Sequence, residues 1–313
     1  MADMIATRDA YGKALVEFGA QYDNLVVLDA DLAAATKTEM FKKAYPDRFF
    51  DCGIAENNMI GVASGLALSG KIPFASSFAM FAAGRSFEQV RNSVGYPGTN
   101  VKIGATHGGI TVGEDGATHQ CLEDFALMRT IPGMTVICPA DAGEARLAVQ
   151  AAIEYNGPVY LRFGRMAVPV LYDNSYAFSI GKGSRLVEGN DVSLIANGVE
   201  VEQALVAAEL LKADGIHASV VNMATIKPLD QEMVLEEAKR CGCIVTCEEH
   251  SVIGGLGAAV CEFLSETMPT PVLRVGTNDC YGRSGSAKVL LSLFGLDAAA
   301  ICEKAKAAIQ MKK

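Results

Sequence analysis

The stretch RFFDCGIAENNMIGVASGLALSGKIPFASS (residues 48–77) contains a complete strand–helix–strand pattern. A strand is expected over 48–53. A helix is expected over 55–70, where apolar residues recur every three or four positions, and a second strand over 71–77. Such strands are apolar on both faces, which is typical of a parallel sheet covered by helices. The stretch therefore predicts an α/β fold.

The same alternation extends on both sides of this stretch. Further strands are expected at LVVLDAD (25–31), VKIGATH (101–107), MTVICPA (134–140) and PVYLRFG (158–164), and helices over 7–20, near 81–95 and over 141–155. Residues 165–185 have no sustained period, and the strand–helix pattern then starts again. A chain of 313 residues is also longer than one core usually holds. We therefore expect a parallel-sheet domain (1–170), a linker (171–187) and a smaller α/β domain (188–313).

The composition limits the possible functions. Half of the residues are hydrophobic, a fifth are charged, and the net charge is -9. A nucleic-acid surface would need basic stripes, so no nucleic-acid partner is expected. No apolar run is long enough for a membrane span, and the N-terminus lacks a basic-then-apolar signal pattern. We therefore expect a folded cytoplasmic protein with no membrane partner.

The cysteines favour a reducing compartment over a metal site. Cys52, Cys138, Cys243 and Cys247 lie in or beside apolar, strand-like runs, which is typical of small buried residues in the cytoplasm. Cys241, Cys243 and Cys247 form a cluster with His250 nearby, but the second pair of a zinc site is missing. No metal ligand is therefore expected in this chain.

Glu56 is the clearest candidate for a functional side chain. In a helix that starts near Ala55, it shares one face with Met59, Ile60 and Ala63. A buried, unpaired carboxylate is costly, so it needs a partner or a task. The alternative is a surface glutamate in the first turn that complements the helix dipole. The pattern alone leaves both interpretations open.

Two other segments could form a binding site. Phe78 and Phe81 are three residues apart, so we expect both rings on one side of a helix turn, as core packing or as an aromatic wall for a flat heterocycle. THGGITVGEDGATHQ (106–120) is a polar, Gly-rich loop after a strand, where open α/β sheets place ligands. Its His107 and His119 lie outside any apolar stripe, whereas Asp115 and Glu114 could also cap the loop.

Two further patterns remain open or unfavourable. Arg162 and Arg165 lie at the end of a predicted strand, a position that suits a bound phosphate or carboxylate, a solvated charge or an ion pair between domains. GGLG (254–257) is similar to a nucleotide-binding turn, but Val260 stands where the last glycine of that motif is needed. We interpret it as a tight turn that packs a helix on a sheet.

Together these segments resemble the C-terminal half of transketolase. DCGIAENNMIGVASGLA is similar to the segment with the cofactor-activating glutamate, SSFAMF to the aromatic patch, and THGGITVGEDGATHQ to the substrate loop. The resemblance implies a pyrimidine-binding domain of thiamin enzymes followed by a transketolase C-terminal domain. Full-length transketolases also carry a domain that binds the diphosphate and Mg²⁺ through a Gly-Asp-Gly motif, which is absent from this sequence. The chain is therefore similar to the second subunit of a split transketolase.

The resemblance implies roles for individual residues. Glu56 corresponds to the glutamate that hydrogen-bonds the aminopyrimidine ring nitrogen and so favours the tautomer that deprotonates the thiazolium carbon. Phe78 and Phe81 correspond to residues that pack on the pyrimidine. His107 and His119 correspond to residues that contact sugar hydroxyls and assist proton transfer, and Asp115 to one that accepts a hydrogen bond from a substrate hydroxyl. The resemblance also implies sugar-phosphate binding by Arg165, Arg8 and, as a weaker candidate, Arg91, and a place near the cofactor and subunit interface for Asp31. The implied cofactors are thiamin diphosphate and Mg²⁺, held mainly by the partner.

Two positions depart from the family pattern. Gly84 stands where a third aromatic residue often occurs, so the wall around the pyrimidine is expected to be thinner or to be completed by another chain. Ala35 stands where a phosphate-binding serine often occurs, and Thr36 or Thr38 could replace that serine.

The predicted activity is transfer of a two-carbon ketol unit between sugar phosphates, as in the pentose phosphate pathway, by a two-plus-two heterotetramer. One alternative is a β-type subunit of a 2-oxo acid dehydrogenase or a deoxyxylulose-phosphate synthase, although the GEDGATHQ loop favours transketolase. The other alternative is a non-catalytic regulatory subunit. That alternative predicts loss of the activating acid, whereas Glu56, both histidines and Asp115 are all present.

Overall fold

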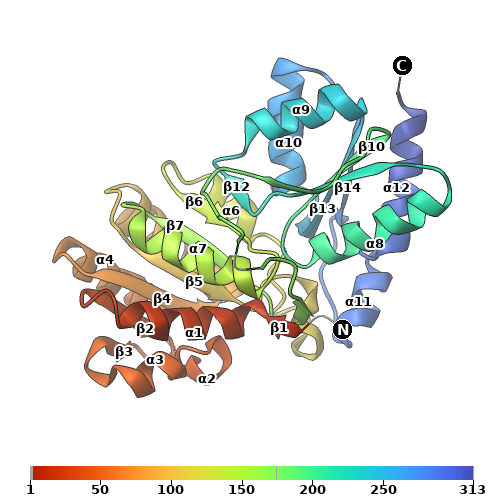
Figure 1. Ribbon diagram of the computed structural model, residues 1–313. Coiled ribbons are helices and arrows are strands. Elements are labelled where there is room, and N and C mark those ends of the chain that lie inside the picture. Colours follow the sequence, from red (N-terminus) through yellow and green to blue (C-terminus); the bar gives the residue numbers. More distant parts are fainter. Residues whose placement is uncertain (1–2, 174, 313) are drawn as a thin grey trace.

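The computed structural model describes residues 3–173 and 175–312, which form two α/β domains (Figure 1). The first domain contains a seven-stranded sheet in the order β12-β6-β7-β5-β4-β2-β3, parallel except for β12. Its strands are β2 (Leu25–Asp29), β3 (Phe49–Asp51), β4 (Ile72–Phe78), β5 (Lys102–Thr106), β6 (Thr135–Ile137), β7 (Val159–Phe163) and β12 (Thr225–Lys227). A two-stranded ribbon of β1 (Met4–Ala6) and β8 (Ala167–Pro169) lies beside it.

Helices cover both faces of the first sheet, as strands buried along their whole length require. These helices and turns are α1 (Thr7–Gly19), α2 (Ala33–Thr36), α3 (Glu39–Ala44), η1 (Pro46–Arg48), α4 (Glu56–Leu68), α5 (Phe87–Gln89), α6 (Asp124–Arg129) and α7 (Ala142–Glu154). Each face has its own core. Met59, Ile60 and Ala63 of α4 pack into one, and Leu15 and Phe18 of α1 into the other.

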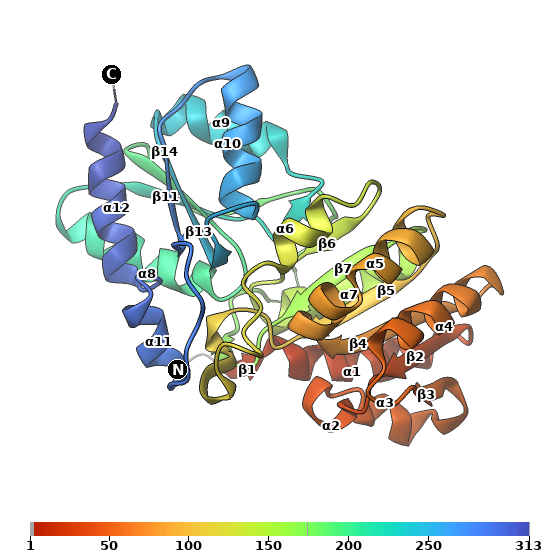
Figure 2. The ribbon, with the colours of Figure 1, turned by 180° about the vertical axis from the view of Figure 1, so that it is seen from behind.

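The second domain contains a five-stranded sheet in the order β14-β13-β10-β11-β9. Its elements are β9 (Ser184–Val187), β10 (Val192–Ala196), α8 (Glu200–Ala213), β11 (Ala218–Asn222), α9 (Gln231–Cys241), β13 (Ile244–Ser251), α10 (Leu256–Thr267), β14 (Val272–Thr277), α11 (Ala287–Leu293) and α12 (Ala298–Gln310). In the view from behind, α10 and α12 lie on opposite faces of this sheet (Figure 2). The predicted α/β class with mainly parallel sheets is confirmed.

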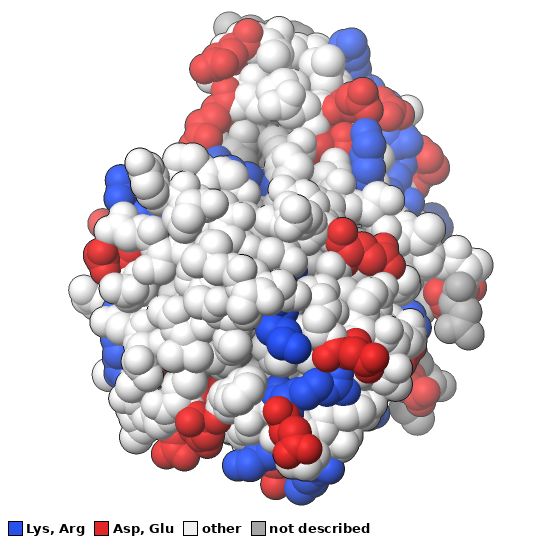
Figure 3. All heavy atoms as spheres, turned by 90° about the vertical axis from the view of Figure 1, so that its left-hand side faces the viewer, with Lys and Arg blue, Asp and Glu red and all other residues white. Residues whose placement is uncertain are grey.

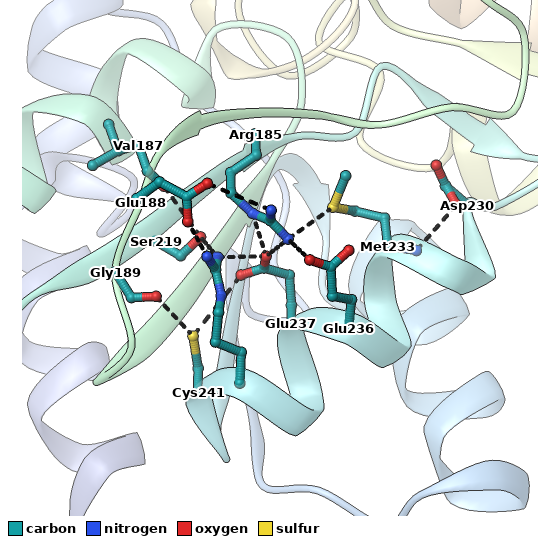
Figure 4. Close-up of polar contacts among 11 residues, drawn as sticks. Arg185, Val187, Glu188, Gly189, Ser219, Asp230, Met233, Glu236, Glu237 and Cys241 are labelled. Carbon is teal, nitrogen blue, oxygen red and sulfur yellow. Dashed lines mark hydrogen bonds and ion pairs between the residues drawn. The ribbon is translucent and has the colours of Figure 1, made fainter.

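An ion-pair cluster joins the edge strand β9 to α9 (Figure 4). The fully buried Glu237 accepts hydrogen bonds from Arg185 and Arg240, at 2.8 and 2.7 Å. Burial opposes ionisation of Glu237, but these and other hydrogen bonds outweigh it and hold the pKa of Glu237 below its ordinary value. Arg185 also binds Glu236, and Arg240 binds Glu188. Because each of these charged side chains is paired with another member of the cluster, we interpret the cluster as a structural contact that holds the edge strand β9 against α9.

Three expectations differ from the structure. The predicted linker (171–187) includes β9, because this short strand pairs antiparallel with β11 and needs no apolar pattern of its own. The predicted helix near 81–95 is interrupted. It consists of the π-helical turns η2 (Met80–Arg85) and η3 (Val90–Gly95), with α5 between them. Finally, β12 leaves the second domain and joins the edge of the first sheet beside β6, which links the domains through backbone hydrogen bonds.

No helix among residues 3–173 and 175–312 is long and apolar enough to cross a membrane.

Candidate active site

Glu56 is buried at the start of α4, in agreement with its place on the apolar stripe. Only 2% of the residue is exposed, and Met59, Ile60 and Ala63 on the same stripe are completely buried. Arg85 donates from Nη1 to both carboxylate oxygens, at 3.0 Å each. The interpretation as a surface glutamate that complements the helix dipole is therefore wrong, because the carboxylate is turned toward the protein and paired there.

An aromatic cluster lies next to this carboxylate. The rings of Phe78 and Phe81 are 5.9 Å apart between centroids and nearly parallel, at 14°. His107 stacks on Phe78 at 3.8 Å, and His119 meets both phenyl rings edge-on, at 6.1 and 5.4 Å. The guanidinium of Arg85 lies over the Phe81 ring at 4.5 Å, which connects the cluster to Glu56. The structure thus brings together four predicted site residues around one charge pair.

The spacing of the two phenylalanines predicted a shared helix turn, but the structure places them in different elements. Phe78 is the last residue of β4, whereas Phe81 lies in η2. Stacking arises because the chain turns from strand to π-helix between them, and such turns are frequent at functional sites. A side chain at Gly84 would meet the side chain of Met80, so Met80 fills the space next to that position.

His107 is held as a neutral imidazole. Arg8 Nη1 lies 2.8 Å from Nε2, and the hydroxyl of Thr106 lies 2.9 Å from Nδ1. A guanidinium can only donate, so Nε2 accepts and the proton is assigned to Nδ1. Burial, and then the charges of Arg8 and Arg165, lower the pKa of His107 to about 3. Its φ of 57° is strained for histidine, a feature that clusters at functional sites.

The polar loop (106–120) carries His107 and His119 of this cluster and contains the short helix η4 (Ile110–Asp115). Asp115 is exposed, and the adjacent Gly113 and Gly116 have φ values of 84° and 77°, which favour glycine. Arg165 donates to the Val112 carbonyl and, at 3.0 Å, to Glu114. About a third of the Arg165 side chain remains exposed. An acid and a cation are thus available at the rim of the loop.

Two predicted site residues lie apart from this cluster. Asp31 is exposed in the turn after β2, where its backbone N–H donates to Asp51 at 3.2 Å. Arg91 is exposed on η3 and donates to the neighbouring Asn92 at 2.6 Å. Within the described chain, no hydrogen bond, ion pair or ring contact joins either residue to Glu56 or to the aromatic cluster. Sequence proximity to a family motif did not distinguish them from residues that face the site.

Thr36 and Thr38 do not have free hydroxyls, so the idea that either replaces a phosphate-binding serine is wrong. Both are completely buried and donate to Asp29 Oδ2, at 2.7 and 2.8 Å. Burial raises the pKa of Asp29 to about 6, against the hydrogen bonds that it accepts. This carboxylate therefore shapes the turn whose Ala35 carbonyl receives a hydrogen bond from Arg8, at 3.1 Å.

The second domain supports the polar loop (106–120), a contact that the sequence did not predict. Glu249 accepts from the backbone N–H of Thr111, and Gln120 donates to the Arg283 carbonyl at 3.0 Å. Arg162 is 3% exposed, pairs with Asp124 at 3.3 Å and donates to the Glu249 carbonyl at 2.8 Å. Arg162 is therefore not a solvated charge: its ion pair with Asp124 lies within the first domain, and it reaches the second domain through a hydrogen bond to a backbone carbonyl.

Arg85 was also missed, although an arginine four residues after Phe81 in an otherwise apolar run was a usable signal. A single buried carboxylate such as Glu56 predicts a cation nearby but does not indicate which residue supplies that cation. The π-helical turn sets the direction of Arg85, and periodicity does not reveal such a turn.

Comparisons with known proteins agree with this geometry. The family model of the transketolase pyrimidine-binding domain matches residues 3–170, and that of the transketolase C-terminal domain matches 181–301. A protein of Methanocaldococcus jannaschii described as a transketolase C-terminal section is 53% identical over 300 residues, 95% of this chain and 94% of that protein. Human transketolase is 37% identical over 313 residues, covering 99% of this chain but 50% of the human chain.

Among solved structures, a split-gene transketolase in the form of an inactive β4 tetramer superimposes with a TM-score of 0.93. It is 52% identical, and the match covers 99% of this chain and 100% of that chain.

Proposed function

This chain belongs to the transketolase family, and we propose that it is the cofactor-activating subunit of a split transketolase. The reaction would move a two-carbon ketol unit from a ketose phosphate to an aldose phosphate. One observation carries the proposal: the Glu56 carboxylate is almost fully buried, yet it is separated from the stacked aromatic rings by a single guanidinium. A subunit without catalytic function would have no reason to keep this buried acid beside two histidines.

The residues of this chain fit the aminopyrimidine half of thiamin diphosphate. That group is flat and offers a ring nitrogen to an acceptor. Glu56 supplies a buried acceptor, and the nearly parallel rings of Phe78 and Phe81 supply flat apolar faces. The diphosphate and Mg²⁺ need a separate site, because the sequence contains no Gly-Asp-Gly motif. We assign that site to a partner subunit.

When bound, thiamin diphosphate supplies the carbon centre that carries the two-carbon unit. The side chains of this subunit position the reactants and hold protons. Glu56 would accept a hydrogen bond from the protonated ring nitrogen of the aminopyrimidine, and its burial would strengthen that bond. His107 keeps its proton on Nδ1 and presents Nε2 as an acceptor for a sugar hydroxyl in place of Arg8.

The rim residues would recognise the rest of the sugar. His119 is partly exposed and contacts both phenyl rings, so it can reach a second hydroxyl. Asp115 would accept a hydrogen bond from a hydroxyl of defined configuration. Arg165 and Arg8 supply positive charge for the sugar phosphate, as guanidinium groups do at phosphate sites. Arg91 and Asp31 lie farther out and would contribute only where a partner chain covers them.

An uncharged face of the first domain suits the partner. α4 exposes Val62 and Leu68, and the preceding turn exposes Ile54, at 39%, 76% and 76%. Gly61 and Gly65 between them allow close approach of another backbone. Figure 3 shows this side of the molecule, where a broad central area has few charged atoms. An apolar exposed area of this kind marks protein interfaces, and a closed two-plus-two assembly would bury it.

The test is an assay with ribose 5-phosphate, xylulose 5-phosphate, thiamin diphosphate and Mg²⁺. The chain is assayed alone and then mixed with its candidate diphosphate-binding subunit. Ketol transfer only in the mixture is expected. Activity of the chain alone would contradict the assignment of the diphosphate site to a partner. Decarboxylation of a 2-oxo acid without an acceptor sugar would favour a dehydrogenase-type subunit instead. Ketol transfer between these two sugars would also support a place in the pentose phosphate pathway.

A further inference from the structure

Arg85 occupies the two groups that a pyrimidine ring would use. Its Nη1 donates to both oxygens of Glu56 at 3.0 Å, and its guanidinium carbon lies 4.5 Å from the centre of the Phe81 ring. Half of the Arg85 side chain is exposed, whereas Glu56 is 2% exposed. The cation therefore approaches the buried acid from the solvent side, over the phenyl ring.

A guanidinium and an aminopyrimidine can make the same contacts with Glu56 and Phe81. Both are planar, both donate N–H to a carboxylate, and both pack face-on against an aromatic ring. A pyrimidine ring that packs on Phe81 and binds Glu56 would need the space that the guanidinium takes. The two cannot make the same contacts at the same time.

We propose that Arg85 is an internal stand-in for the aminopyrimidine, which closes the site while the subunit lacks cofactor and withdraws when thiamin diphosphate binds. The inference rests on the proposed function and extends it to the cofactor-free subunit. Arg85 is in this view a positioning residue rather than a catalytic one.

The energetics of the Arg85–Glu56 pair suit this reversible closure of the site, which is called here the latch. A buried carboxylate without a counter-ion is strongly unfavourable, so the free subunit gains from the pair. The cation is half exposed, so solvent screens the attraction and the arginine can turn outward at low cost. A fully buried arginine such as Arg162, with Asp124 as its partner, could not be released in this way.

The experiment is calorimetric titration of thiamin diphosphate, with Mg²⁺, into the assembled complex of this chain with its diphosphate-binding subunit. Arg85→Met is expected to bind the cofactor roughly three- to fivefold more tightly, because a half-exposed pair contributes at most about this factor to an equilibrium constant. Arg146→Met is the matched control. Arg146 also lies over a phenyl ring (Phe18, 5.2 Å) and pairs with Glu17, but on α7 outside the site. We expect unchanged affinity for this control.

Two further variants separate the latch from other roles of Arg85. In Glu56→Gln, adding Arg85→Met should change the affinity by less than about twofold, because the charge pair is already absent. Arg85→Lys keeps the charge but loses the planar contact with Phe81, so it should tighten binding by less than Arg85→Met does. It also provides the test if Arg85→Met does not fold.

Two results would count against these ideas, and they are distinguishable. Equal or weaker cofactor binding by Arg85→Met, or by Arg85→Lys in its place, would overturn the latch. It would show that Arg85 assists the bound state or plays no part. If a folded Glu56→Gln complex keeps native turnover, the proposed role of Glu56 fails, and the latch fails with it.

Discussion

The two parallel sheets use their carboxyl ends differently. In the first sheet, β4 ends at Phe78 and β5 leads directly into His107, so aromatic rings and ionisable groups gather beyond these strand ends, in a region called here the first crevice. In the second sheet, β13 carries Glu248, whose carboxylate accepts from the backbone N–H groups of Leu256 and Gly257, at 2.7 and 2.8 Å. These N–H groups begin α10, the place where doubly wound folds bind phosphate. The chain fills that place itself.

This contrast explains why GGLG is not a nucleotide site. A Cβ at Gly255 would collide with the Glu248 carboxylate, and a Cβ at Gly257 with the Thr246 hydroxyl. Glycine is needed there for close packing of the chain on itself. The next residue, Glu249, accepts from Thr111 of the substrate loop. The strand ends of the first sheet thus gather side chains with candidate chemistry, whereas the corresponding region of the second sheet, called here the second crevice, is filled by the chain itself and braces the first.

The largest effect that sharpens this comparison is expected at His107. Asn tolerates the positive φ of this position, so His107→Asn should fold normally but lose proton transfer. Turnover of the assembled enzyme should fall by roughly 10²–10⁴-fold. His217→Asn, an exposed histidine in the second domain, is the control and should keep full turnover. Wild-type turnover in His107→Asn would mean that the first crevice is not used as we infer.

The second crevice should respond in stability rather than in chemistry. Glu248→Ala leaves the N–H groups of Leu256 and Gly257 without their acceptor, so the free energy of unfolding should fall by about 2–4 kcal/mol. Urea denaturation of the chain measures this. Glu262→Ala, which removes an exposed ion pair with Arg129, should cost less than about 1 kcal/mol. A stable Glu248→Ala variant with strongly reduced substrate affinity would instead identify the second crevice as a binding site.

A smaller effect concerns Glu144, which joins the domains. Its carboxylate accepts from Asn222 of β11 at 2.9 Å and from Tyr176 at 2.7 Å. Burial raises the pKa of Glu144 from 4.5 to about 7, so the folded state binds the proton more tightly than the unfolded chain does. Stability from this group is therefore fully present below about pH 4.5 and is lost as the pH rises from there through about 7.

Glu144→Gln cannot ionise, so its free energy of unfolding should fall less between pH 5 and 7, by roughly 1–3 kcal/mol. Asp29, whose pKa burial raises to about 6, acts in the same direction, so part of the slope should remain in the variant. Denaturant titrations at several pH values measure both slopes. An unchanged slope in Glu144→Gln would show that Glu144 does not control this window.

Periodicity was sufficient where tertiary contacts follow the local pattern. The helix expected over 55–70 is α4, and the position of Glu56 on its buried face followed from the spacing of Met59, Ile60 and Ala63. The alternation of strands and helices also predicted both sheets, because strands buried on both faces are continuously apolar.

Sequence reasoning failed where a distant contact or an unusual turn decides the structure. The π-helical turn after β4 separates Phe78 from Phe81 and directs Arg85 toward Glu56. β12 pairs with β6, nearly ninety residues earlier in the chain. Asp31 is exposed in the turn after β2, and its place near the cofactor and subunit interface stays a prediction.

The most direct test of the central claim is the turnover and folding of Glu56→Gln in the assembled enzyme. Glutamine keeps the size of the side chain but cannot carry the charge that the aminopyrimidine nitrogen needs. We expect turnover to be abolished, while the circular dichroism spectrum and the assembly with the partner remain as in the native protein. Turnover near the native level in a folded Glu56→Gln complex would contradict the assignment of Glu56, and with it the functional meaning of the first crevice.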